Sequence, residues 1–201
     1  MDASGSADAA FFDDLYTQDP DPWDYASDPY EQAKYLRQLD WLTEGGRRRL
    51  HRTLEVGCSI GVFTRMLAAS SDRVEAFDLS STAIEIARRA LRDIDNVTLD
   101  VRAFPMPDPP DPGRYDAIVV SETLYYLDDR ALATAVAWLS EAVGAGAAVV
   151  TANFLPAERT PIVLDALETG LGAHRRRRER TPATGADERG RAYVTELFGP
   201  N

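Results

Sequence analysis

The sequence predicts an α/β fold, in which helices cover both faces of a mostly parallel sheet. From about residue 52 onward, short apolar runs that end in turn residues alternate with helix-length amphipathic segments. Strands that alternate with helices in this way are typical of parallel sheets with helical crossovers. Two further strand-like runs, joined by a polar loop, follow near the end and indicate an antiparallel hairpin. At 201 residues, the chain is long enough for one domain with a sizeable core.

The central elements can be predicted one by one. Thr82, followed three residues later by Glu85, is typical of a capping box that starts a helix. Segment 104–114 contains five prolines, which predicts a surface loop with no helix or a very short one. The expected strands are 53–57, 73–78, 96–101, 115–121 and 147–154. The expected helical faces consist of Val62, Phe63, Met66 and Leu67, then Ile84, Ala87 and Leu91, then Leu132, Val136, Leu139 and Val143.

The two ends of the chain differ from this central part. Residues 1–10 have neither the basic residues nor the apolar stretch of a secretory signal, so we expect a disordered tail and a cytoplasmic protein. Segment 11–50 includes DPWDY at 21–25 and a helix-like stretch at 30–42, and it is expected to form a helical cap. After a short helical stretch at 162–171, the arginine-rich run 173–181 and the run 191–198 form the expected hairpin.

Charge and composition exclude several classes of protein. The net charge of −11 argues against general nucleic-acid binding and favours small cationic or neutral partners. The arginines at 173–181 are therefore interpreted as an edge strand protected by charge, with Glu179, Asp187 and Glu188 nearby. No apolar run approaches a membrane span. A single cysteine, Cys58, and two histidines in the whole chain predict no disulfide framework and no metal site.

The most informative stretch is LEVGCSIGVFT at 54–64, where a strand runs into a glycine-bearing turn and a helix. Gly57 and Gly61 allow a sharp turn and a close approach of a ligand, at the strand ends where ligands bind in such sheets. A dinucleotide fingerprint would need glycine at 57, 59 and 62, but Ser59 and Val62 occupy two of these positions. A tight turn with no ligand role remains the alternative.

Acidic residues follow or lie within the neighbouring strands. Asp78 ends the next strand, about twenty residues after the glycines, where a carboxylate can accept both ribose hydroxyls of a nucleoside; capping of the following helix is the alternative. Glu55 lies within a buried strand, where a carboxylate needs a partner. Glu122 comes after the fourth strand, so we expect it to line the same crevice with the residues around it, Ser121, Tyr125 and Tyr126. The tyrosines could equally pack a helix.

Taken together, these residues resemble the class I S-adenosylmethionine-dependent methyltransferases. Their first motif, acidic-x-Gly-x-Gly-x-Gly, is matched by Glu55, Gly57 and Gly61, with Ser59 at the middle glycine. More narrowly, DPWDY, YEQAKY, LEVGCSIGVFT, FDLS and YDAIVVSETLYYLDD occur in the order in which they occur in the rhizobial nodulation N-methyltransferases. That family methylates the free amine of a deacetylated chitooligosaccharide. The resemblance extends from about residue 19 to the C-terminal hairpin.

The resemblance implies a Rossmann-like sheet of seven strands with the last one antiparallel, and S-adenosylmethionine as cofactor. It implies one domain over 11–201, with a cap or lid at 11–50, a cofactor-binding core at 51–154, and a helix and hairpin at 155–201. Asp78 would bind the ribose and the loop from Glu55 to Gly61 the methionine portion. The acidic residue that often recognises adenine is replaced by Ala103, so backbone groups and stacking would serve instead. The expected cofactor-binding residues are Glu55, Gly57, Cys58, Ser59, Gly61, Asp78, Leu79, Ala103, Phe104 and Ser121.

The expected reaction is methyl transfer to the amine of an amino sugar or a related small molecule. Glu122 would bind the incoming ammonium and receive its proton, while Tyr125 and Tyr126 would offer aromatic faces to a cation. Trp23, Tyr30 and Lys34 are expected to belong to the lid and touch the substrate. The alternatives are a small-molecule O-methyltransferase, an NAD-dependent oxidoreductase on the related fold, and a non-catalytic adenosyl-binding module.

Overall fold

The computed structural model describes residues 8–181 and 191–200 and contains one seven-stranded sheet, of order β3-β2-β1-β4-β5-β7-β6. Every neighbouring pair is parallel except β5–β7 and β6–β7, as the sequence predicts. The strands are β1 (Leu50–Val56), β2 (Ser71–Asp78), β3 (Val97–Val101), β4 (Ala117–Ser121), β5 (Ala148–Phe154), β6 (Arg175–Thr181) and β7 (Tyr193–Phe198). The helices are α1 (Ala9–Gln18), α2 (Pro29–Leu42), α3 (Val62–Ser70), α4 (Ser81–Ala90), α5 (Asp129–Gly144) and α6 (Thr160–Leu171), with short 3₁₀ turns η1 (Pro112–Arg114), η2 (Leu124–Tyr126) and η3 (Gly172–His174).

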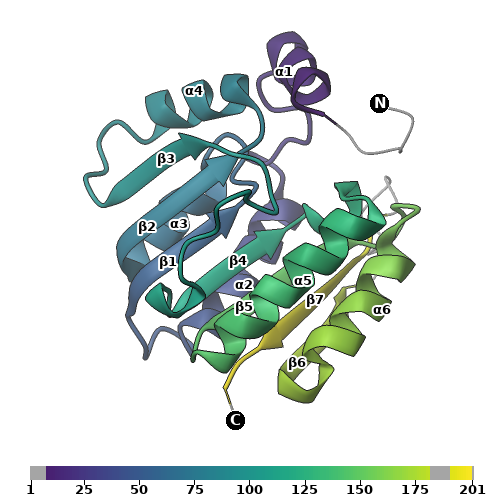
Figure 1. Ribbon diagram of the computed structural model, residues 1–201. Coiled ribbons are helices and arrows are strands. Elements are labelled where there is room, and N and C mark those ends of the chain that lie inside the picture. The colour runs from purple at the N-terminus through teal and green to yellow at the C-terminus, as the bar shows by residue number, and fades with distance from the viewer. Residues whose placement is uncertain (1–7, 182–190, 201) are drawn as a thin grey trace.

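Helices cover both faces of the sheet, and each face has its own core. In Figure 1, α5 and α6 lie in front of the sheet, while α2 and α3 lie behind it. Leu54 and Val56 of β1 pack toward the α5–α6 side, while Glu55 lies between them in the strand and reaches α3 on the other side. This alternation places one carboxylate inside the core on the side of the first crossover helix.

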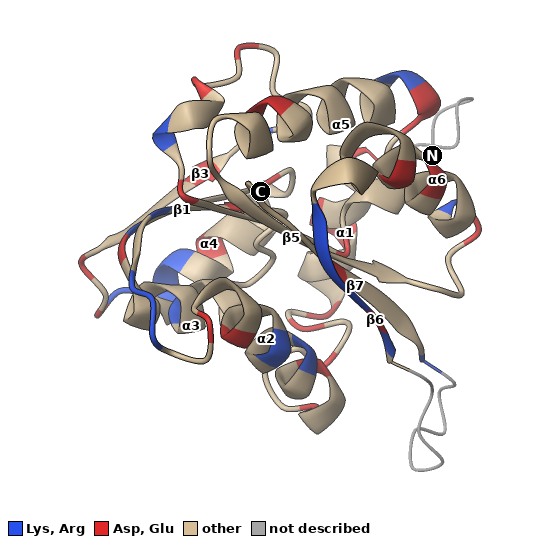
Figure 2. Cartoon of the chain, turned by 90° about the horizontal axis from the view of Figure 1, so that it is seen from below, with Lys and Arg blue, Asp and Glu red and all other residues tan. Residues whose placement is uncertain are grey.

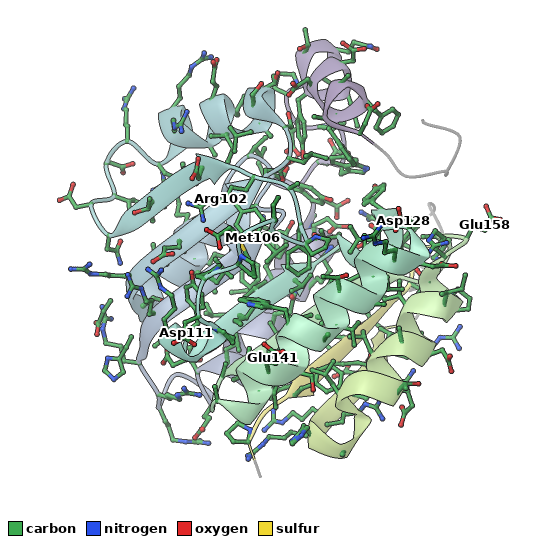
Figure 3. All side chains as sticks on the ribbon, in the orientation of Figure 1. Arg102, Met106, Asp111, Asp128, Glu141 and Glu158 are labelled. Atoms are coloured by element: carbon green, nitrogen blue, oxygen red, sulfur yellow. The ribbon has the colours of Figure 1, made fainter. Side chains whose placement is uncertain are left out.

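The connection after β3 follows the prediction. Between Val101 and Ala117, the described chain holds only the three-residue turn η1, because proline prevents a longer helix. Figure 3 labels Arg102, Met106 and Asp111 along this loop, which passes over the sheet on the side of α5. Met106 is buried against the core of that side, and Trp138 Nε1 of α5 donates a hydrogen bond to Pro110 O. The loop therefore covers the sheet where a crossover helix would otherwise lie.

Two sequence predictions about helix starts are corrected. Ala9 and Ala10 belong to α1, not to the tail expected over 1–10, because the Asp8 carboxylate accepts from the Phe11 amide and caps the helix; residues 1–7 lie outside the described residues. Helix α4 is capped by Ser80, which accepts from the Ala83 amide, and not by Thr82. The prediction fails there because the Thr82 amide donates to Asp13 of α1.

The arginine-rich run forms the exposed edge strand that the sequence predicts. Figure 2 shows the basic segments of β6 along one edge of the sheet. Arg175 pairs with the buried Glu196 of β7 and with Glu168 of α6, and Arg37 of α2 pairs with Glu179. Asp187 and Glu188, which were also expected nearby, lie outside the described residues. In the described part of the chain, no helix is long and apolar enough to cross a membrane.

Candidate active site

The loop after β1 turns sharply because three of its residues have positive φ: Gly57 (+73°), Ser59 (+51°) and Gly61 (+83°). A Cβ on Gly57 would lie 2.3 Å from Thr123 Oγ1, and one on Gly61 would lie 2.9 Å from Leu91 Cδ1. The predicted turn is therefore confirmed. The atoms that exclude a side chain at both glycines belong to the chain itself, namely to the segment after β4 and to the end of α4.

Asp78, at the end of β2, is tied to this loop. Its Oδ2 accepts a hydrogen bond from the Ser59 amide at 2.8 Å, and its Oδ1 accepts one from the Ser80 amide at 2.9 Å. Burial raises the pKa of the Asp78 carboxyl, against the effect of these amides. Each oxygen keeps a second lone pair, so the carboxylate can still accept hydrogen bonds from a ligand in the adjacent cavity.

Glu55 is 3% exposed and has one strong partner, because Thr64 Oγ1 of α3 donates to Glu55 Oε2 at 2.6 Å. Burial raises the pKa of Glu55 from 4.5 to about 8, because this hydrogen bond offsets the desolvation of the carboxylate only in part. A glutamate in a core strand is costly, and here it lines the cavity beside the glycine loop.

This pKa predicts how stability changes with pH. The unfolded chain releases the Glu55 proton near pH 4.5, whereas the folded chain holds it up to about pH 8. The stabilisation from Glu55 is therefore complete below pH 4.5 and is lost as pH rises toward 8. We expect Glu55→Gln to match the wild type at pH 5 and to exceed its free energy of unfolding by roughly 2–5 kcal/mol at pH 8.5.

Urea unfolding of both proteins at pH 5, 7 and 8.5 measures this difference. Glu85→Gln is the matched control, because Glu85 is an exposed carboxylate on α4 that pairs with Arg89. The control is expected to change stability by less than about 0.5 kcal/mol at each pH. If the free energies of unfolding of wild type and Glu55→Gln change with pH in parallel, that result would contradict the raised pKa of Glu55.

A first hollow of about 260 Å³ lies at the carboxyl ends of β1, β2 and β4, where the sequence predicts a ligand site. Every predicted cofactor-binding residue except Gly61 lines it: Glu55, Gly57, Cys58, Ser59, Asp78, Leu79, Ala103, Phe104 and Ser121. Gly61 instead packs against α4. In the described part of the chain, no group of three or more His, Cys, Asp or Glu could hold a metal ion.

Helix α1, most of which lies in the segment 11–50 expected to form a cap or lid, closes one side of this hollow through two residues that the sequence did not single out. Figure 1 shows α1 beyond the carboxyl ends of the strands, beside α4. Its Phe12 and Tyr16 line the hollow, and the Tyr16 hydroxyl lies 2.6 Å from Ser59 Oγ. Asp13 Oδ1 accepts from Ser80 Oγ at 2.6 Å and from the Thr82 amide at 3.0 Å, which fastens α1 to the start of α4.

Glu122, directly after β4, has the most unusual environment of the predicted catalytic residues. Its φ is +59°, a left-handed backbone that a non-glycine residue rarely adopts, and its side chain is 10% exposed. Tyr125 OH donates to Glu122 Oε2 at 2.7 Å. The other oxygen, Oε1, is buried and forms an ion pair with Lys34 Nζ at 3.5 Å. Burial raises the pKa of Glu122, and the Lys34 charge and the Tyr125 hydroxyl oppose that effect.

A second hollow of about 610 Å³ meets the first one at Glu122. Four residues line both hollows: Trp23, Tyr25, Glu122 and Tyr126. Aromatic rings dominate the wall of the second hollow, which also includes Tyr125, and Arg159 and Glu158 lie at its rim. Glu158 is exposed and points away from the body of the protein (Figure 3). The Glu122 carboxylate thus lies between the two hollows and can receive a proton from a group that binds there.

The three predicted lid residues differ in whether they line the hollows. Trp23 lines both hollows, as expected of a lid. Tyr30 lines neither; its hydroxyl donates to Arg191 O, and its ring packs on Tyr193. Lys34 also lines neither, because it is 6% exposed and lies behind Glu122. Tyr30 and Lys34 therefore lie outside the lining of both hollows.

Comparisons with known proteins agree with this architecture. The model of the family described as Nodulation protein S (NodS) matches residues 11–149. Nodulation protein S of Bradyrhizobium diazoefficiens is 37% identical over 114 residues, which cover 54% of this chain and 50% of that protein. A ubiquinone biosynthesis O-methyltransferase of Bordetella parapertussis is 32% identical over 115 residues, which cover 54% of this chain and 46% of that protein. The chain thus spans about half the length of the curated relatives it matches.

A solved structure is similar over almost the whole chain. The N-methyltransferase NodS from Bradyrhizobium japonicum WM9, in complex with S-adenosyl-L-homocysteine, superposes with a TM-score of 0.80. The match covers 97% of this chain and 100% of that one, at 21% sequence identity. At this identity the likeness shows the fold, namely that of the methyltransferases with a Rossmann-like sheet, and the chemistry has to be argued from the site.

Proposed function

Because the chain belongs to the nodulation protein S family, we propose that it transfers a methyl group from S-adenosylmethionine to the amine of a small molecule. The family model covers both the loop after β1 and the segment around Glu122. The observation that carries the proposal is the position of Glu122, a largely buried carboxylate at the junction of the two hollows.

The first hollow fits an adenosyl cofactor. Asp78 offers lone pairs on both carboxylate oxygens to the ribose hydroxyls, and the loop from Gly57 to Ser59 forms part of the wall. The edge of the hollow at Ala103 and Phe104 provides backbone groups and a ring for adenine, in place of an acidic side chain. When bound, the cofactor supplies an electrophilic methyl group on a sulfonium.

Glu122 would prepare the acceptor for attack. An amine attacks carbon only with its lone pair free, so an ammonium must first lose a proton. The proton passes from the ammonium nitrogen to the Glu122 carboxylate, which the Tyr125 hydroxyl holds in place. The neutral amine then forms the new nitrogen–carbon bond as the carbon–sulfur bond breaks. General-base catalysis of this kind contributes about 10²–10⁴-fold to the rate, and the alignment of the two reactants contributes most of the rest.

The second hollow supports an acceptor larger than an amine group alone. Its volume is more than twice that of the first hollow, and its aromatic wall can pack against the face of a ring. An amino sugar combines such a ring with a free amine, and we propose this class as the acceptor. The test is mass-spectrometric detection of methyl transfer to a panel of amino sugars, each paired with its N-acetylated form.

The outcomes of this test are distinct. A gain of one or more methyl groups on the free amines alone supports the proposal. A gain on both members of each pair would indicate a hydroxyl acceptor, the activity named for the Bordetella relatives. His51 and His174 line neither hollow, so O-methylation would also have to rely on a carboxylate as base. No gain on either member, with cofactor binding established by calorimetry, would overturn the amino-sugar proposal.

The remaining alternatives receive less support. Family membership favours methyl transfer over NAD-dependent oxidation and over a non-catalytic adenosyl-binding module. A shift of midpoint temperature with NAD, and none with S-adenosylmethionine, would revive the first of these. The cytoplasmic location and the absence of nucleic-acid partners remain predictions from the sequence.

A further inference from the structure

Lys34 of α2 lies in a buried cage behind Glu122. Its ammonium is over the faces of three tyrosines, with Nζ 4.1 Å from the ring centroid of Tyr193, 5.3 Å from Tyr35 and 5.7 Å from Tyr25. The Nζ atom forms an ion pair with Glu31 Oε2 at 2.6 Å. Cation–π contacts and this ion pair offset part of the cost of burying the charge.

The ion pair with Glu31 does not by itself account for the buried lysine. Glu31 Oε1 already accepts from Tyr193 OH and from Arg191 NH1, the latter at 3.1 Å. Glu31 therefore has a cation, Arg191, and a hydroxyl, that of Tyr193, as partners in addition to Lys34. The other carboxylate within reach of the ammonium is Glu122, whose Oε1 lies 3.5 Å away.

We propose that Lys34 is a positioning residue that keeps Glu122 ionised in the free enzyme, and that it thereby sets the lower end of the pH range in which methyl transfer proceeds. The inference rests on the proposed function of Glu122. Lys34 itself touches neither hollow, so it acts through Glu122 and not on the acceptor.

The groups that face Glu122 determine whether its carboxyl is charged. A carboxyl at this depth favours its neutral form, in which it could neither attract an ammonium nor accept a proton. Among the charged neighbours, Lys34 forms an ion pair with Glu122 and its charge opposes protonation, whereas the charge of Glu31 favours it. Five phenols that stay neutral at physiological pH also surround the carboxyl: Tyr125 and Tyr126 of η2, Tyr25 of the segment before α2, Tyr35 of α2 and Tyr193 of β7. Three more charged residues, Glu158, Arg159 and Arg191, line the second hollow with Glu122.

The experiment compares the wild type with Lys34→Met, which keeps the length of the side chain and removes its charge. The ionisation of Glu122 is measured by infrared titration of the carboxyl band, assigned by its absence in Glu122→Gln. We expect the titration of Glu122 to move upward by about one to three pH units. The lower limb of the kcat/KM profile against pH should move by the same amount, and kcat/KM should recover in alkaline solution.

Two further variants distinguish this role from a structural one. Lys34→Arg restores a cation and is expected to bring the Glu122 titration back to within about half a pH unit of the wild type. Arg37→Met removes a charge from the exposed side of the same helix, where Arg37 pairs with Glu179, and should leave the titration unchanged. Circular dichroism establishes that each variant is folded. If Lys34→Met unfolds, the Glu122 titration in Lys34→Arg and in Glu31→Gln is compared instead; removal of the Glu31 charge should move it downward.

The infrared readout separates the two proposals. A Glu122 titration that coincides in wild type and Lys34→Met overturns the role of Lys34, whatever the activity. Absence of methyl transfer in the wild type overturns the proposed function, yet the infrared comparison still shows whether Lys34 controls Glu122. A shifted titration with an unshifted pH profile would also overturn the inference, because methyl transfer would then not depend on the charge of Glu122.

Discussion

Replacement of Glu122 with glutamine is expected to lower kcat/KM for an amine acceptor by about 10²–10⁴-fold at pH 7. The amide has the shape of the carboxyl and can still accept the Tyr125 hydrogen bond, but it can neither attract an ammonium nor take its proton. The variant then depends on amine that is already neutral in solution. Its deficit should therefore shrink as the pH approaches the pKa of the acceptor, which a series of rate measurements from pH 7 to 9.5 would show.

Two controls make this result specific to Glu122. Glu158→Gln applies the same change to a carboxylate at the rim of the second hollow, where the side chain is exposed, and should alter kcat/KM by less than about threefold. Binding of S-adenosylhomocysteine to Glu122→Gln should stay within about threefold of the wild type, because the loss lies in the chemical step. Full activity of Glu122→Gln at pH 7 would show that no carboxylate base is needed.

The topology and the position of Glu122 could be predicted because they follow from local patterns. Apolar runs that alternate with amphipathic helices define a parallel sheet, and in such a sheet the residues after each strand share one edge. Asp78, at the end of β2, and Glu122, after β4, consequently lie at the same edge, although 44 positions separate them in sequence. Neither prediction needs any knowledge of how helices pack.

The N-cap of α4 shows that a local sequence pattern can predict the wrong residue. Thr82 with Glu85 is a valid local signal, but Ser80 provides the cap because Asp13, from a helix some seventy positions earlier, binds the Thr82 amide. A local pattern cannot include a carboxylate that arrives from a remote segment. The same limit applies to α1: the sequence predicts a cap over 11–50, but it does not identify Phe12 and Tyr16 as residues that line the first hollow.

Lys34 shows how little a sequence pattern predicts about the surroundings of a charged residue. Its three-residue spacing from Glu31 on α2 could have indicated the ion pair that the structure contains. Its burial could not be predicted, because lysine is almost always exposed and the ring closest to its ammonium belongs to β7 at the other end of the chain. The sequence predicts Lys34 in the lid, whereas the structure places its ammonium among three tyrosine rings, outside the lining of both hollows.

Replacement of Gly57 with alanine is expected to destabilise the protein by about 2–4 kcal/mol. The φ of +73° costs an alanine about 1 kcal/mol. The added Cβ would lie 2.3 Å from Thr123 Oγ1, closer than any real carbon contact, so the loop or Thr123 must shift. Thr123 Oγ1 donates to Val56 O and Ser121 O, which limits that shift and adds to the cost. Urea unfolding measures the total.

Gly46→Ala separates the two contributions. Gly46 has nearly the same φ, +77°, but a Cβ there would meet nothing within 4 Å, so this variant reports the backbone cost alone. We expect it to lose only about 1 kcal/mol, and the remaining loss in Gly57→Ala is the contact with Thr123. Thr123→Ala should recover most of that remainder in a double-mutant cycle. Equal destabilisation by Gly57→Ala and Gly46→Ala would instead show that the loop after β1 can shift to accommodate a Cβ at little cost. Glycine would then be required at position 57 only for its positive φ.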